Sequence, residues 1–296
     1  MKIYLLFLSF ILFNLSLHSQ ANLLNARVPQ DIGQLNEKQV ESNDEEPLEY
    51  GFIDDRDVLW SKTVWEIIDL DERINFPYYY PTDTLNLGPD RRSLFHILKK
   101  NLRSGNIKEV YDDDYFQIKL TYREILDKLV SIDTLDAGFE QLNAGEALDP
   151  QYVNRRNITA REIRQYRIKG TWYFNKRQGE LKYRMLGLAP VAPDVYTLDK
   201  PEAEQDLVEL FWIWFPDARQ SLNTSTVFNT RNSSQPITYD HMLNSRRFNS
   251  IIYKEENVYE DRLIDEYIFE DALQQLLESE RIKSVIRDFE QDMWNN

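Results

Sequence analysis

The 296-residue sequence contains no cysteine. This absence excludes disulfide bonds, thiolate zinc sites and a lipid-bearing N-terminal cysteine. Histidine is also scarce, and beyond the N-terminal segment only His96 and His241 occur. Each lies in an expected helix at a position typical of a structural residue, and the chain has neither a phosphate-binding glycine motif nor a Gly-x-Ser-x-Gly motif. We therefore predict no catalytic, cofactor-binding or metal-binding residue, no cofactor, and a protein that is not an enzyme.

Positive charge is in short supply, because 35 basic residues against 50 acidic ones give a formal net charge of −15. This balance argues against binding to nucleic acid or to anionic lipid headgroups and favours basic or neutral proteins as partners. Among the acids, Asp112, Asp113 and Asp114 are the best candidates for a metal site. The glycine and terminal glutamate of a calcium loop are missing, so we interpret this run as a solvated acidic turn.

A long apolar run occurs only at the N-terminus. Lys2 precedes IYLLFLSFILFNLSL, and the small residue Ser19 stands before Gln20. This pattern predicts a signal peptide at residues 1–19, with an uncleaved membrane anchor as the alternative, although the run is short for a membrane span. No later segment is apolar enough to cross a bilayer, so we expect an exported protein without direct membrane insertion.

Residues 20–50 are polar and lack periodicity, which predicts a flexible acidic arm. Eight acids and one base, Arg56, occur between Glu41 and Asp57. The arm is either a solvated linker or a segment that becomes ordered on a partner. We expect the remaining residues, 51–296, to form a single α+β domain of antiparallel, aromatic-rich sheet elements with flanking helices.

The clearest structural pattern begins at Gln165 with QYRIKGTWYFN, turns through KRQG and returns as ELKYRMLGLAPVAP. Its two-residue period and glycine-containing turn predict an antiparallel β-hairpin. The later run VELFWIWFP is apolar at almost every position from Val208 to Phe215, which predicts a central strand. We assign Trp212 and Trp214 to the core and part of the tyrosine-rich edge at Tyr78–Tyr80 to an interface. A carbohydrate platform is the alternative use of these aromatics.

Several helix signals flank the hairpin. Asp90 is suited to cap a helix through Arg103, with Gly105 as its stop. Thr121–Glu124 forms a capping box at the start of a second helix, and Thr159–Glu162 forms another capping box. We also expect a strand or edge segment at Glu72–Tyr80, a helix at Tyr239–Asn249, and a long helix ending near Trp294 with the apolar residues Leu273, Leu276, Leu277, Ile282, Val285, Ile286, Phe289 and Met293.

Two parts of the chain share short motifs. SLFHIL at 93–98 matches TYDHML at 238–243, and VYDDDYF at 110–116 matches VYEDRLI at 258–264. These matches indicate either an internal duplication of about 58–130 and 164–277, packed as one body, or chance similarity in an aromatic-rich chain.

Three stretches resemble one known family. The resemblance is carried by YRIKGTWYFNKRQGELKYRMLGLAPVAPDV, by ELFWIWFPDAR, and by LNSRRFNSIIYKEENVY with QLLESERIKSVIRDFEQDMW. From about Gly51 to the C-terminus the chain is similar to the gliding-motility protein GldN, called PorN in non-gliding relatives. The resemblance implies a structural subunit of the type IX secretion system of Bacteroidota, located in the periplasm at the inner face of the outer membrane.

The same resemblance implies the partners. They are an outer-membrane lipoprotein of the GldK (PorK) type, further copies of the chain in a ring, and the periplasmic part of the GldM (PorM) motor protein. The residues themselves indicate a non-catalytic scaffold without nucleic-acid partners. A periplasmic carbohydrate- or peptide-binding module that uses the aromatic strands is the alternative function.

Overall fold

The computed structural model of the protein describes residues 46–83, 92–227, 237–269 and 271–294. The expected signal peptide at 1–19 and most of the expected arm at 20–50 lie outside the described residues. The described part combines helices with antiparallel sheets, so the predicted α+β class is confirmed.

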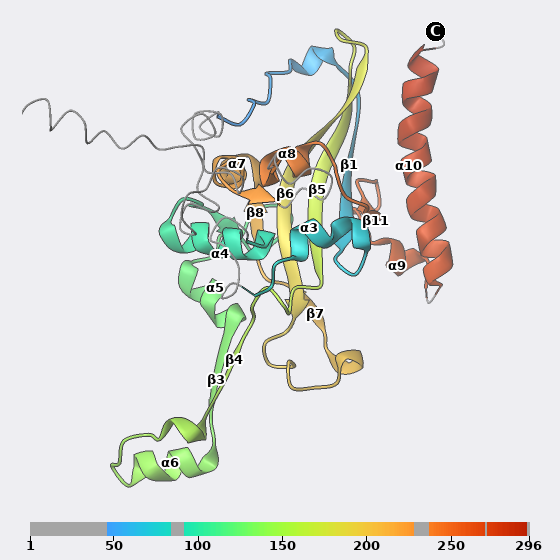
Figure 1. Ribbon diagram of the computed structural model, residues 1–296. Coiled ribbons are helices and arrows are strands. Elements are labelled where there is room, and N and C mark those ends of the chain that lie inside the picture. Colours follow the sequence, from blue (N-terminus) through green and yellow to red (C-terminus); the bar gives the residue numbers. More distant parts are fainter. Residues whose placement is uncertain (1–45, 84–91, 228–236, 270, 295–296) are drawn as a thin grey trace, which may run out of the picture.

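Three long antiparallel strands form the centre of the protein (Figure 1). They are β1 (Val58–Asp69), β5 (Gln165–Asn175) and β6 (Glu180–Pro193), and they belong to a seven-stranded sheet with the order β11-β1-β5-β6-β8-β2, in which β7 also pairs with β6. The remaining strands of this sheet are short: β2 (Val110–Tyr111), β7 (Leu207–Glu209), β8 (Trp212–Trp214) and β11 (Ile251–Glu255).

The predicted hairpin is confirmed as β5 and β6, and Gly179 in its turn adopts a left-handed φ of 66°. Gly170 on β5 is required for packing, because a Cβ at this position would lie 2.1 Å from the hydroxyl oxygen of Tyr183. The single strand expected over Val208–Phe215 was wrong in extent. The run divides into β7 and β8, and Phe215 already begins a helix, because Pro216 fits the first helical turn and cannot donate to a strand ladder.

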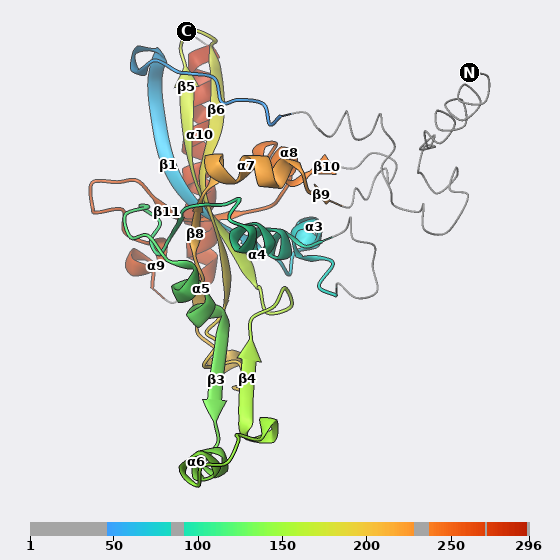
Figure 2. The ribbon, with the colours of Figure 1, turned by 90° about the vertical axis from the view of Figure 1, so that its left-hand side faces the viewer.

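Helices cover the sheet and supply much of the main core (Figures 1 and 2). Fully buried Leu98, Phe215 and Leu243 come from three different helices and pack with Ile168 and Leu188 of the hairpin. The helices are α3 (Phe76–Tyr79), α4 (Leu94–Ser104), α5 (Tyr122–Leu129), α6 (Asp136–Asn143), α7 (Phe215–Asn223), α8 (Tyr239–Asn244), α9 (Ile264–Tyr267) and α10 (Ala272–Trp294).

The strand or edge segment expected at Glu72–Tyr80 was wrong. A short 3-10 turn at Arg73–Asn75 leads directly into α3, where Pro77 occupies the first turn. Tyr78 is completely buried, and its ring lies near that of Tyr239, so tertiary packing selects the helical conformation.

Most of the expected helix signals are confirmed, with shifted boundaries. Helix α4 has Ser93 as its N-cap, whereas Asp90 lies outside the described residues, and Gly105 ends the helix in the left-handed conformation as predicted. The capping box at Thr121–Glu124 begins α5 as predicted. The second box, at Thr159–Glu162, closes only a turn, with the Thr159 N–H donating to Glu162 Oε2 at 2.7 Å. The helix expected at Tyr239–Asn249 is shorter, because it ends at Asn244.

The C-terminal helix α10 ends at Trp294, as predicted. It packs on the sheet through Ile282 and Ile286, which form a second core with Val64, and Phe289 stacks on Trp60 with ring centroids 4.7 Å apart. Not all of its expected apolar residues pack inward. The largely exposed ones are Leu273, Leu276, Leu277 and Val285.

The two segments compared for duplication differ in element order. In both, a hydroxyl side chain caps a helix, Ser93 for α4 and Thr238 for α8. Strand β1 is followed by helices, however, whereas β5 returns at once as β6. The structure therefore gives the duplication no support beyond these two helix starts.

Residues 130–157 project from the body as a separate hairpin, here called the lobe. Strands β3 (Val130–Thr134) and β4 (Val153–Asn157) form its stem, and α6 lies at its far end. Figures 1 and 2 both show the lobe pointing away from the body, opposite the turn between β5 and β6. A further small pair, β9 (Thr226–Val227) with β10 (Ile237–Thr238), lies near α8.

Candidate functional site

Each carboxylate in the acidic turn at 112–114 makes contacts that stabilise the fold. Asp112 pairs with Lys128, and Asp114 Oδ2 accepts from Lys254 Nζ at 2.7 Å. Asp113 accepts backbone N–H groups from residues 115, 117 and 118 at 3.1, 2.9 and 2.8 Å. In the described part of the chain, no group of three or more His, Cys, Asp or Glu residues is arranged to hold a metal ion.

Two lysines attach this turn to the sheet. Lys169 Nζ donates to the carbonyl oxygen of Asp114 at 2.9 Å, and burial lowers the pKa of this lysine. Lys169 Nζ and Lys254 Nζ lie 4.6 and 4.3 Å from the ring centroid of Trp65. These cation–π contacts stabilise the turn against the sheet. Both lysine ammonium groups are therefore used within the fold.

The two histidines lie at equivalent positions in the first turns of α4 and α8. The backbone N–H of His96 donates to Ser93 Oγ at 3.4 Å, and that of His241 donates to Thr238 Oγ1 at 3.2 Å. Burial, and then the charges of Arg92, Lys100 and Lys99, lower the pKa of His96.

The aromatic strands bury most of their side chains. Trp212 is fully buried, as predicted, whereas Trp214 is only partly buried and packs against Phe116. Of the expected tyrosine-rich edge, Tyr78 is buried and Tyr80 is exposed. A sugar-binding platform needs exposed ring faces, which the buried members of this set do not provide.

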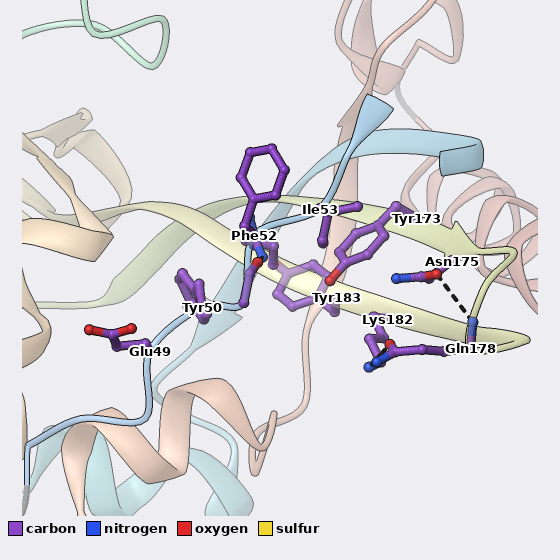
Figure 3. Close-up of a pocket in the computed structure, with 11 residues that line it drawn as sticks. Glu49, Tyr50, Phe52, Ile53, Tyr173, Asn175, Gln178, Lys182 and Tyr183 are labelled. Atoms are coloured by element: carbon purple, nitrogen blue, oxygen red, sulfur yellow. Dashed lines mark hydrogen bonds between the residues drawn. The ribbon is translucent and has the colours of Figure 1, made fainter. Parts of the chain in front are cut away.

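A groove of about 340 Å³ lies between residues 49–53 and the hairpin (Figure 3). Between Glu180 and Met185, one edge of β6 pairs with β5. At the other edge, the described pairing of β6 with β8 begins only at Gly187. The groove is lined by Glu49, Tyr50, Gly51, Phe52, Ile53, Tyr173, Asn175, Gln178, Lys182, Tyr183 and Arg184.

Tyr50 anchors the segment that borders the groove. Its hydroxyl donates to Asn244 Oδ1 at 2.5 Å, and its ring lies 4.3 and 4.9 Å from the guanidinium carbons of Arg219 and Arg184. Burial raises the pKa of Tyr50 to about 12. We expected the arm to stay flexible as far as Tyr50. It already contacts the body at this residue, because the Tyr50 ring replaces water over two guanidinium groups.

The lobe carries an exposed apolar surface that sequence reasoning missed. Leu135, Phe139 and Leu142 recur at i, i+4 and i+7 along α6, and they are 52, 54 and 48% exposed. The spacing of these residues was visible in the sequence. The exposure of their side chains was not, because the same pattern is typical of a helix face that packs on a core.

No helix in the described ranges is long and apolar enough to span a membrane. The chain matches no curated protein. Residues 53–295, which make up most of the chain, match the family described as gliding motility associated protein GldN. The chain belongs to the GldN family of gliding motility associated proteins.

Proposed function

We propose that this protein is a non-catalytic structural subunit of the type IX secretion and gliding-motility machinery. In this proposal it forms a ring with an outer-membrane lipoprotein of the GldK (PorK) type and also contacts the periplasmic part of a GldM (PorM) motor protein. Membership of the GldN family over residues 53–295 is the observation that carries the proposal.

The distribution of surfaces supports a scaffold role. A subunit that closes into a ring by head-to-tail contacts needs two different side surfaces. The lobe, the exposed leucines of α10 and the groove beside Tyr50 lie on separate parts of the chain. The polar clusters described above, at 112–114 and around the helix starts, already serve the fold.

The proposed location is the periplasm at the inner face of the outer membrane. Residues 1–19 have the pattern of a signal peptide, and the sequence contains no cysteine to carry a lipoprotein-type lipid. The lipoprotein partner would therefore hold the mature protein at the membrane.

Envelope fractionation tests the proposal. In cells that contain the GldK-type lipoprotein, the protein should sediment with outer membranes and co-purify with that lipoprotein. In cells that lack the lipoprotein, it should leave the membrane fraction or be degraded, and re-expression of the lipoprotein should restore sedimentation. Membrane association that persists without the lipoprotein would contradict the proposal.

A periplasmic peptide- or carbohydrate-binding module is the second candidate function. The groove favours it, because about 340 Å³ is within the range of small-ligand sites and Tyr173 and Phe52 line it. Calorimetric titration of the mature protein with oligosaccharides and short peptides tests this candidate. Saturable binding that is lost in Tyr173→Ala would support it, and the absence of binding heat would exclude these ligands.

A further inference from the structure

The lobe is held outward by its two attachment points in the main core, and Arg156 of β4 adds a pair with Asp199 of the body at 3.2 Å. Leu129 and Ile158 are buried in the main core at the base of the stem, and the Ile158 N–H donates to the Leu129 carbonyl at 2.8 Å. At the far end, buried Gly138 faces Leu148 and Tyr152, so its position on α6 is used to pack the lobe itself. Most other residues of α6 are exposed.

The exposed surface of α6 combines apolar and acidic residues. The stripe of Leu135, Phe139 and Leu142 is about half exposed along its length. Asp136 and Glu140 lie beside it on the same helix, and both are exposed. From 131 to 154 the sequence has five acids and no base, namely Asp133, Asp136, Glu140, Glu146 and Asp149. Such a helix is suited to a groove that is apolar in the middle and basic at its rim.

Helix α4 has the opposite charge. From 92 to 108 the sequence has no acid and five bases, Arg92, Lys99, Lys100, Arg103 and Lys108. Lys100, Arg103 and Lys108 are exposed, and His96, Lys99, Lys100 and Arg103 recur at i, i+3, i+4 and i+7 along one face of the helix. Glu162 acts electrostatically on Lys99, one of the residues of this face.

The helix that contacts α4 carries exposed aromatic side chains. Helix α3 contacts α4, and Phe76 and Tyr80 at its ends are 37 and 53% exposed. Their rings lie 5.5 Å apart in an edge-to-face arrangement. The neighbouring helices α3 and α4 thus carry exposed aromatic rings and exposed lysine and arginine side chains, which complement the lobe in both polarity and charge.

We infer that the lobe of one copy docks onto the α3–α4 surface of a second copy. The lobe leaves the body beyond α5 and points away from it in both views, so the complementary surfaces of one chain face different neighbours (Figures 1 and 2). A contact between two different surfaces is heterologous, and its repetition gives a closed ring or an open filament. The inference rests on the proposed function only in taking another copy as the neighbour.

Charge reversal on the two surfaces tests the contact. Asp136→Lys/Glu140→Lys and Lys100→Glu/Arg103→Glu change exposed helix positions, and circular dichroism checks that both variants fold. Each variant alone should lose self-association of the mature full-length chain by at least about tenfold in sedimentation velocity. The control Glu256→Lys/Asp288→Lys makes the same charge change as the lobe variant at exposed positions elsewhere and should associate like the wild type.

Mixing the two variants makes the test specific. One variant keeps an intact α3–α4 surface and the other an intact lobe, and the two reversed surfaces are again opposite in charge, so an equimolar mixture should recover the self-association that each variant lacks. A mixture that stays monomeric would overturn the inference, as would a wild-type chain that is monomeric at every concentration. Self-association that is unchanged in both variants would also overturn it.

Engineered disulfides report the contact directly, because the chain has no cysteine of its own. Glu140→Cys mixed with Lys100→Cys should give a disulfide-linked heterodimer in isolated envelopes, whereas Glu140→Cys mixed with Gln178→Cys should not. No cross-link despite normal co-purification with the lipoprotein would overturn the inference and leave the proposed function intact. A cross-link in envelopes where fractionation shows no dependence on the lipoprotein would support the contact and refute the proposed location.

Discussion

At the scale of single residues, charged side chains that enter the core are matched by defined partners. Glu66 is 1% exposed and accepts two hydrogen bonds from Arg246 at 2.9 and 2.6 Å, together with one from Ser250. The guanidinium carbon of Arg246 lies 4.2 and 5.2 Å from the rings of Tyr183 and Trp172. This cluster joins β1 to the segment after α8, so a local change here affects packing between distant parts of the chain.

Replacing Glu66 by alanine should lower the free energy of unfolding by about 3–5 kcal/mol, because it leaves a largely buried guanidinium without its counter-charge. Chemical denaturation measures the effect. Glu278→Ala removes a pair on α10 with Arg281, whose side chain is 55% exposed and therefore screened by solvent, and should cost much less. Equal losses in the two variants would contradict the assignment of Glu66 to a buried pair.

The imidazole of His96 should titrate below the ordinary value of 6.5, because burial and three nearby cations lower its pKa. NMR titration of the ring protons measures this shift, and Lys100→Gln should move the pKa upward. Since the unfolded chain takes up the proton first on acidification, the stability contributed by neutral His96 is present above pH 6.5 and is lost as pH falls toward the folded pKa. A midpoint at or above 6.5 would refute the shift.

At the scale of elements, α10 shows how one helix serves two surfaces. Ile282, Ile286 and Phe289 pack on the sheet, whereas Leu273 and Leu277 are largely exposed on the other side. The same three- and four-residue steps contribute to both faces, so periodicity predicted the helix without showing which leucines would be buried.

Phe289→Ala should loosen the C-terminal half of α10, because it removes the ring that stacks on Trp60 and contacts Phe174. Hydrogen exchange should become faster in this half of the helix and remain slow in β5. Leu277→Ala is the matched control, since that side chain is 60% exposed and should change exchange little. Unchanged protection in Phe289→Ala would show that the stack does not hold the helix.

At the scale of the whole molecule, the lobe contributes little to the main core of the body. The main core includes Leu129 and Ile158 at the base of the lobe, and of the lobe's apolar side chains only Val130 packs against that core. Arg156 of the lobe also pairs with Asp199 of the body at 3.2 Å. The stem ladder pairs Val130 with Asn157 and Ser131 with Arg156. Its removal should therefore affect assembly much more than folding.

Replacing 132–155 with Asn-Gly should join Ser131 to Arg156 through a two-residue hairpin turn and leave the body folded. We expect a melting temperature close to that of the full chain, because no fully buried core side chain is removed, together with loss of self-association. Differential scanning calorimetry and sedimentation velocity measure the two properties. A large drop in melting temperature would show that the lobe contributes to the core.

Local signals in the sequence determined the hairpin at β5 and β6, the capping box at Thr121, the stop at Gly105 and the existence of α10. Each depends on neighbouring residues, through strand alternation, side-chain capping or the left-handed freedom of glycine. The family resemblance was likewise carried by contiguous motifs.

Tertiary structure decided the features that depend on distant contacts. Burial of Tyr78 against Tyr239 makes Glu72–Tyr80 partly helical, and docking of Tyr50 between Arg184 and Arg219 attaches the end of the arm. The outward direction of the lobe follows from where its two attachment points enter the core. The first two outcomes result from packing between residues more than a hundred positions apart, which no local pattern encodes.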